Sequence, residues 1–221
     1  MPRLFFLIFL FVSPVFSGVV FESVAIPDLN SGGQRILIVG NPSTTQFLGV
    51  RLTISQATLI TAVGGYMVAN PFAQSKLFAA IVPLNGPDDF PSGLNFSPVA
   101  TSTFLPSPVL SDVKAPLNAV LSPGVYGLIF GVGLFGSPIG GEAAMPQRSL
   151  NSNSISSSYF SWTSVSLPVI PGKWQNSELN VRFFVEGTAL PGSLEVPEPS
   201  MLICCLASLA CLWRKRLFDT I

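Results

Sequence analysis

Histidine is absent from this 221-residue chain, and its three cysteines, Cys204, Cys205 and Cys211, all lie near the C-terminus. The remainder of the chain therefore has no imidazole base or ligand, no thiol nucleophile and no disulfide. These absences exclude Ser–His–Asp and Cys–His catalysis and zinc sites built on His or Cys. A domain of this length does not need disulfides, because its size supplies a hydrophobic core. We therefore expect a protein that is not an enzyme and that uses no cofactor or metal.

Charge is scarce as well, since charged residues make up only 10% of the chain. Between Gly18 and Glu198 the acidic residues slightly outnumber the basic ones, and the basic ones are scattered. Binding to phosphate backbones depends on grouped Lys and Arg side chains. The composition therefore argues against a nucleic-acid partner.

The N-terminus has the parts of a secretory signal peptide. Arg3 precedes an apolar run over 4–12, and a short stretch with Pro14 and Ser17 follows it. A positive charge, a short apolar segment and small residues before the boundary are typical of such peptides. We predict a signal peptide over 1–17, cleaved between Ser17 and Gly18. The alternative is an uncleaved anchor, but the apolar run is short for a membrane span, which needs about 20 residues.

The C-terminus combines three ordered features: Pro197-Glu198-Pro199, an apolar run over 201–213, and the basic triplet Arg214-Lys215-Arg216. A helix over the apolar run would be about 20 Å long, short for a hydrocarbon core of about 30 Å. The basic side chains can snorkel to the interface and hold the tail on the cytoplasmic side. The segment 195–221 thus indicates a marginal, temporary membrane anchor.

This arrangement resembles the PEP-CTERM sorting signal of Gram-negative bacteria, which an exosortase is thought to cut near the Pro-Glu-Pro element. The resemblance implies export through the inner membrane, with the secretion machinery and an exosortase as partners. It also implies a location in the cell envelope or extracellular matrix, and a link to exopolysaccharide and biofilm.

The tail departs from the usual pattern in its cysteines. Cys204 and Cys205 could carry lipid, although packing as small apolar residues is the interpretation that we favour. An ordinary anchor after a chance Pro-Glu-Pro is the alternative.

The segment between these ends, 18–194, is predicted to be one all-β domain. The whole chain contains 19 glycines and 20 prolines, which place turns between short apolar runs. This pattern favours short strands over helices. The run over 77–82 is apolar throughout, as expected for a strand buried on both faces. We predict strands over 20–26, 35–39, 47–60, 77–82, 125–134 and 179–185.

Turns at about ten-residue spacing indicate an antiparallel β-sandwich with a jelly-roll-like arrangement, with an open barrel as the alternative. Leu121-Ser122-Pro123-Gly124 reads as a turn, and the pattern from Leu121 to Tyr126 looks like a hairpin of PEP-CTERM proteins. In the strand that follows, Gly131, Gly133 and Gly136 do not form a phosphate loop, because no lysine or helix follows at the required spacing. We expect them to mark bulges or close backbone approach.

Acidic residues offer little chemistry. Asp88 and Asp89 lie in a stretch that reads as a solvated turn; a loop calcium site is the functional alternative. Glu142 follows Gly140-Gly141 and has no partner in the sequence.

Aromatic residues in loops are the other candidates, because exposed rings can stack against sugars. We single out Tyr66, Trp162 and Trp174 as possible glycan contacts, although packing in the core or under a loop is the interpretation that we favour.

Three hypotheses about the function follow. The first is a non-catalytic structural or adhesive envelope protein, the second a carbohydrate-binding module, and the third a glycan hydrolase with two facing carboxylates.

Overall fold

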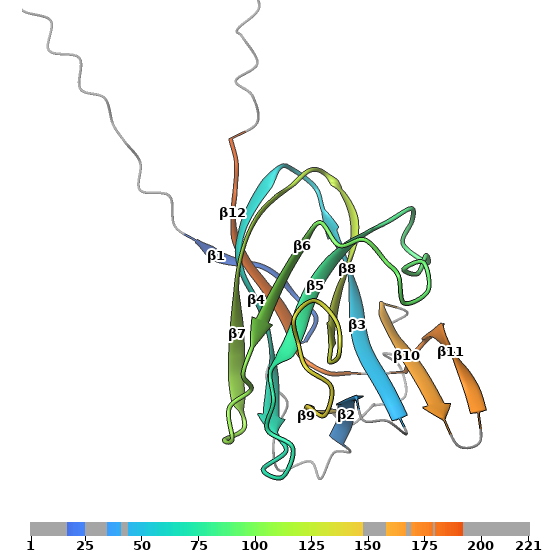
Figure 1. Cartoon of the computed structure of the whole chain (residues 1–221). Helices are drawn as coiled ribbons and strands as arrows, with labels where there is room; N and C mark the ends of the chain where they lie inside the picture. The colour runs from blue at the N-terminus through green and yellow to red at the C-terminus, as the bar shows by residue number, and fades with distance from the viewer. Residues whose placement is uncertain are drawn as a thin grey trace, which may run out of the picture. The chain divides into compact units, whose positions relative to one another are not determined.

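The computed structural model describes residues 17–24, 35–40, 44–147, 158–166, 169–178 and 180–191 (Figure 1). All regular structure in these ranges is strand, and every pairing is antiparallel, which confirms the all-β prediction. The strands are β1 (Gly18–Glu22), β2 (Arg35–Gly40), β3 (Thr44–Ile54), β4 (Thr58–Ala69), β5 (Leu77–Leu84), β6 (Ala100–Phe104), β7 (Ser111–Leu121), β8 (Gly124–Gly131), β9 (Glu142–Pro146), β10 (Tyr159–Ser166), β11 (Val169–Asn176) and β12 (Phe183–Ala189).

Within the same ranges, no helix has the length and apolar character needed to cross a membrane. The predicted signal peptide up to residue 16 and the predicted sorting segment 195–221 lie outside the described residues.

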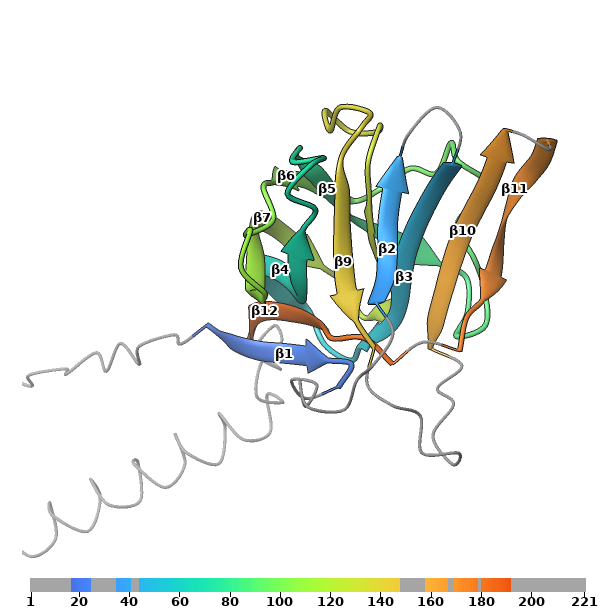
Figure 2. The same cartoon turned by 90° about the horizontal axis from the view of Figure 1, so that it is seen from below.

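The strands form a sandwich-like pair of sheets. Sheet A has the order β1-β12-β4-β7. Sheet B has the order β6-β5-β8-β3-β10-β11, and β2 and β9 continue it from the first half of β3. Figure 2 shows β9, β2, β3, β10 and β11 side by side. The two sheets are joined where the end of β4 pairs with β9.

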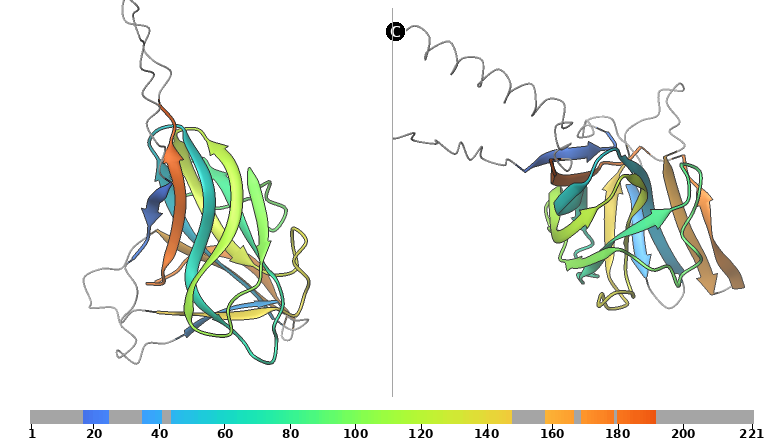
Figure 3. Two further views of the ribbon diagram at one scale, coloured as in Figure 1. Left: turned by 90° about the vertical axis from the view of Figure 1, so that its left-hand side faces the viewer. Right: turned by 90° about the horizontal axis from the view of Figure 1, so that it is seen from above.

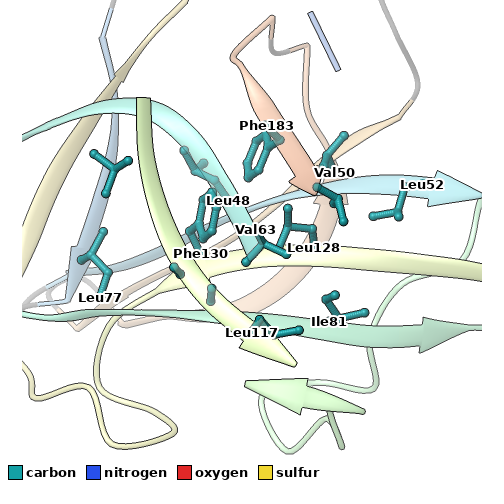
Figure 4. Close-up of a cluster of buried hydrophobic side chains, with 14 of the residues drawn as sticks. Leu48, Val50, Leu52, Val63, Leu77, Ile81, Leu117, Leu128, Phe130 and Phe183 are labelled. Atoms are coloured by element: carbon teal, nitrogen blue, oxygen red, sulfur yellow. The ribbon is translucent and has the colours of Figure 1, made fainter. Parts of the chain in front are cut away.

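The main hydrophobic core lies between the two sheets (Figure 4). Alternate residues of each strand point inward, because successive side chains of a strand face opposite sides of the sheet. At its centre, the rings of Phe130 on β8 and Phe183 on β12 stack with centroids 5.0 Å apart. The labelled side chains in the figure come from both sheets: Leu48, Val50, Leu52, Val63, Leu77, Ile81, Leu117, Leu128, Phe130 and Phe183.

A second apolar cluster covers the opposite face of sheet B. We call it the outer cluster; its buried members are Phe47, Phe78, Ala80, Val82, Phe96, Ile129, Phe160 and Trp162. Phe96 belongs to the segment 85–99, which connects β5 and β6 across this face. The central strands of sheet B, β3, β5 and β8, are therefore covered on both faces. This explains the unbroken apolar run of β5 and confirms the prediction made for 77–82.

Glycines in sheet B make room for the rings of the outer cluster. A side chain at Gly49 or Gly127 would collide with the ring of Phe160, so this ring lies directly on the backbones of β3 and β8. At Gly131, a methyl group would come within 2.5 Å of the ring of Phe78. Close backbone approach, predicted for Gly131, is thereby confirmed. Gly133 and Gly136 instead have positive φ angles in the turn that follows.

Two connections cross from one sheet to the other, side by side (Figure 3). One links β3 to β4 and the other links β7 to β8; Ile54 pairs with Gly124 in sheet B, and Thr58 pairs with Leu121 in sheet A.

Two predictions are therefore wrong. The segment 47–60 is not one strand, because the chain turns at 55–57, where the Thr58 hydroxyl donates to the carbonyl of Gln56. Nor do 121–126 form a hairpin, because β7 and β8 lie in different sheets.

The β7–β8 connection is closed by Tyr126, whose hydroxyl donates to the carbonyl of Ser122 over 2.9 Å. A tyrosine that bonds back to the chain a few residues upstream is a known corner of β-sandwiches. Here it holds Pro123 and Gly124 in the turn between the sheets.

Replacing Tyr126 by phenylalanine is expected to lower the free energy of unfolding by about 1 kcal/mol, the contribution of one hydrogen bond. The buried ring is retained, so packing is not altered. Urea unfolding of the 18–194 domain measures the change. The matched control is Tyr66→Phe, whose hydroxyl closes no turn. Equal midpoints for Tyr126→Phe and the unaltered domain would show that the corner does not stabilise the fold.

The strands give the domain two distinct poles. We call the end with the two crossing connections, 55–57 and 122–123, the arch pole. The opposite end, the loop pole, carries the loops 70–76, 105–110 and 132–141. Gly18 pairs with Gly187, and Ala189 pairs with Thr58 at the start of β4. The first and last strands of the domain therefore begin and end toward the arch pole.

Candidate functional site

The aromatic residues selected from the sequence are mostly covered. Tyr66 is 7% exposed and Trp162 is 8% exposed. The indole of Trp162 lies against the backbone of Gly172, and its buried N–H has no hydrogen-bond partner in the described part of the chain. Tyr66 and Trp162 therefore do not present a ring to solvent, which the glycan-binding hypothesis required of them.

Trp174 is half-buried at the edge of the outer cluster. Its ring meets those of Phe160 and Trp162 edge-on, with centroids 5.3 and 5.5 Å apart. Its Nε1–H donates to the carbonyl of Gly93 over 2.7 Å. Trp174 thus fastens the segment 85–99 to sheet B, in agreement with packing under a loop.

Asp88 and Asp89 belong to a turn that is anchored to sheet B by Arg51. The Asp89 carboxylate accepts the backbone N–H of Asn85 at 3.0 Å and its side-chain amide at 2.8 Å. Hydrogen bonds from the backbone N–H groups of Asn85 and Phe90 lower the pKa of Asp89. A calcium ion bound in this turn would use carbonyl oxygens as ligands. The carbonyls of Asp88 and Asp89 instead accept hydrogen bonds from the guanidinium of Arg51.

Arg51 lies on β3 and is only 6% exposed. Its guanidinium lies between the rings of Phe90 and Phe160, 4.7 and 5.0 Å from their centroids. Burial lowers the pKa of Arg51, and the nearby carboxylates of Asp88 and Asp89 oppose that change. Sequence periodicity missed this role, because a charged residue in a strand normally marks the wet face.

Carboxylates also gather on the outer face of sheet A. Asp112 and Glu22 both pair with Arg182, and Glu186 pairs with Lys114 at 2.5 Å. Burial raises the pKa of Asp112; Lys114 opposes this rise and Glu186 adds to it. These carboxylates bind cations of the protein instead of facing each other across a cleft. They do not provide the arrangement that a two-carboxylate hydrolase needs.

The loop pole presents apolar side chains to solvent. Phe72 is 97% exposed, and Leu105, Val109 and Ile139 are also exposed. Hydrogen bonds join the loops that carry them: Ala69 N–H donates to Ser107 O over 2.8 Å, and the Ser137 hydroxyl donates to Lys76 O over 2.6 Å. Isolated exposed apolar residues need no explanation, but several at one pole indicate an interaction site.

A pocket of about 290 Å³ opens at the same pole. Its lining consists of Val68, Ala69, Asn70, Pro71, Pro108, Glu142, Ala143 and Ala144. Glu142 is the one charged residue among them, and Phe72, which is not part of the lining, follows Pro71 directly in the chain. Small strand residues from β4 and β9 form the floor, because the two sheets join there.

Sequence reasoning did not find this site. Glu142 was noted but had no partner along the chain, and Phe72 was not singled out as a candidate. The signal for Phe72 was its place in Asn70-Pro71-Phe72, directly after a strand, where a turn places the ring outside the sheet. In the described ranges, no group of three or more Asp, Glu, His or Cys residues could hold a metal ion.

No known protein family matches this chain, and no curated protein is detectably similar to it.

Proposed function

We propose that this chain is an exported, tail-sorted protein of the cell envelope or extracellular matrix, with a non-catalytic adhesive role, built on a jelly-roll-like β-sandwich. The observation that carries the proposal is the separation of its two poles. The domain begins and ends toward the arch pole, whereas the exposed apolar side chains and the pocket lie at the loop pole.

The separation is substantial. β4 runs from the arch pole to the loop pole over 12 residues, which corresponds to about 40 Å at about 3.3 Å per residue. A domain held by segments that leave at the arch pole would turn its loop pole away from the membrane. Display of a contact surface at the far end of a tether is what an adhesive protein requires.

The side-chain inventory supports a non-catalytic role. Histidine is absent, and the cysteines lie within the predicted tail. The buried cations Arg51 and Arg182 are engaged with the protein's own oxygen atoms. These residues stabilise the fold, and none is positioned with a nucleophile or a base.

The sorting part of the proposal is tested by replacing Pro197, Glu198 and Pro199 with alanine together. We expect the altered protein to remain in the inner membrane at full tail length, because the processing enzyme no longer recognises its site. Intact mass spectrometry of envelope and culture-fluid fractions of the native host measures this. The unaltered protein should begin at Gly18 and end near residues 197–199. Release of the same shortened product by the alanine variant would contradict the sorting proposal.

A matched control replaces Pro106, Pro108 and Glu178 with alanine, which makes the same chemical changes inside the domain. This control should still be shortened and released. A tail that stays on the unaltered protein would make it a membrane-anchored periplasmic domain instead.

A further inference from the structure

We propose that the pocket at the loop pole binds one uncharged sugar residue of a polysaccharide, with Phe72 as the stacking ring and Glu142 as the acceptor of sugar hydroxyls. This inference rests on the proposed function, since it names the ligand class of the displayed pole. It places the binding site away from Tyr66, Trp162 and Trp174.

Phe72 supplies the apolar contact. A phenylalanine ring that is 97% exposed leaves its whole apolar surface in water, an unfavourable arrangement unless a ligand covers it. The loop backbone that carries the ring is held by two hydrogen bonds. The Phe72 backbone N–H donates to the Asn70 side-chain Oδ1 at 3.0 Å, and Ala73 N–H donates to Asn70 O at 3.1 Å. A loop backbone that is already ordered loses little entropy on binding.

Glu142 and Asn70 supply the polar contacts. Two backbone hydrogen bonds hold Glu142 against the loop, one from its N–H to Ala73 O and one from Asn70 N–H to its carbonyl. Its carboxylate forms no ion pair in the part of the chain that the structure describes, so both oxygens can accept hydroxyl groups. The Asn70 Oδ1 is occupied by Phe72 N–H, which leaves the amide Nδ2 as a donor toward the pocket.

Size and charge narrow the ligand class. A volume of about 290 Å³ lies at the lower end of the range of about 300–1,000 Å³ for small-molecule sites, so the pocket suits one ring of a longer chain. The single charged lining residue is acidic, and a carboxylate repels uronic acids and phosphorylated sugars. Apolar side chains with a few placed polar groups are typical of small-molecule sites in general, and Pro71 and Pro108 supply part of the apolar surface here.

The test uses the full chain in a polyoxyethylene detergent, because detergents with sugar headgroups would compete for the site. Saturation-transfer NMR and calorimetry are run with cellohexaose, mannohexaose and chitohexaose as uncharged probes. Hexaguluronate is the acidic probe. We expect binding of at least one uncharged probe and none of hexaguluronate. Failure of all three uncharged probes to bind, or stronger binding of hexaguluronate, would overturn the inference.

Variants place the site. Phe72→Ala should weaken binding about tenfold, and Glu142→Gln several-fold, through loss of the stacking ring and of the charged acceptor. Phe72→Tyr should bind like the unaltered chain. Val120→Ala is the matched control, because it removes another exposed apolar side chain, 61% accessible, from the outer face of sheet A. Circular dichroism checks that each variant is folded. Unchanged binding by Phe72→Ala would place the sugar elsewhere and overturn the inference.

Two outcomes separate this inference from the proposed function. A released, shortened protein that binds none of the uncharged probes would leave display intact and remove the sugar site. Vesicles of zwitterionic phosphatidylcholine, which have no net charge, provide the second arm. Binding to them that Phe72→Ala abolishes, without sugar binding, would identify the loop pole as a lipid contact and overturn the sugar assignment.

Discussion

Replacing Phe130 by alanine is expected to lower the free energy of unfolding by about 4 kcal/mol, the largest effect of any single change considered for this domain. Phe130 has no exposed surface and stacks on Phe183 at the centre of the main core. Its ring also meets that of Phe104 edge-on at 5.6 Å. Because β8 is paired on both sides, by β3 and β5, the backbone cannot move in to fill the space.

Urea unfolding of the 18–194 domain measures this change. The matched control is Phe72→Ala, the same chemical substitution at a ring that packs on nothing. It should alter the free energy of unfolding by less than about 0.5 kcal/mol. If the two variants were equally stable, either the core would not be centred on Phe130 or the loop pole would contribute to the fold.

Arg51→Ala is expected to cost about 3 kcal/mol and to release the segment 85–99 from sheet B. The truncation leaves the carbonyls of Asp88 and Asp89 and the side chain of Asn176 without their donor. It also removes the cation between Phe90 and Phe160. Buried groups that lose a charged partner are costly, whereas an apolar replacement of similar size costs less.

Chymotrypsin detects the release, because Phe90, Leu94 and Phe96 are potential cleavage sites within the segment. We expect rapid cleavage there in Arg51→Ala and slower cleavage in Arg51→Met, which keeps the packing. Lys173→Ala, at an exposed cation on β11, is the control and should cut like the unaltered domain. Resistance of Arg51→Ala to chymotrypsin would mean that the Trp174–Gly93 contact alone holds the segment.

Sequence patterns predicted the strands whose apolar character is local. β5 is apolar throughout because both of its faces are covered. β8 begins at Gly124, one residue before its predicted start, and ends at Gly131, three residues before its predicted end. β12 begins at Phe183, four residues after the start of the predicted strand 179–185, and continues to Ala189. In these segments the local sequence is enough to indicate which residues are buried.

The strands that were missed depend on distant partners. β7 buries Val113, Ala115 and Leu117 in strict alternation, but prolines and charges between them concealed the pattern. β10 contains three serines, and β11 contains Pro171 and Gly172. The two strands become a ribbon only through pairing with each other and with β3. Proline and serine are typical of turns, so local propensity opposed the assignment and tertiary pairing overrode it.

The candidate site was hidden for the same reason. Tyr66 and Trp162 lie next to turn-forming residues in the sequence, but strands that are far away in the sequence cover them. Phe72 resembles a core residue in the sequence, but it is exposed. Glu142 lies next to Val39 because β9 pairs with β2, and next to the loop after β4 because β9 also pairs with the end of β4. The exposure of a side chain depends on which loops meet at a pole, and residue spacing along the chain does not indicate this.

The neighbouring positions of Gly18 and Ala189 toward the arch pole bear on how the chain matures. A domain whose ends emerge close together can close its sheets while both flanking segments are still inserted in one bilayer, since neither has to be pulled across the fold. The two predicted cleavages would then be independent of each other in time. Folding of the exported part need not wait for either one, so a partly processed chain would already carry a finished β-sandwich.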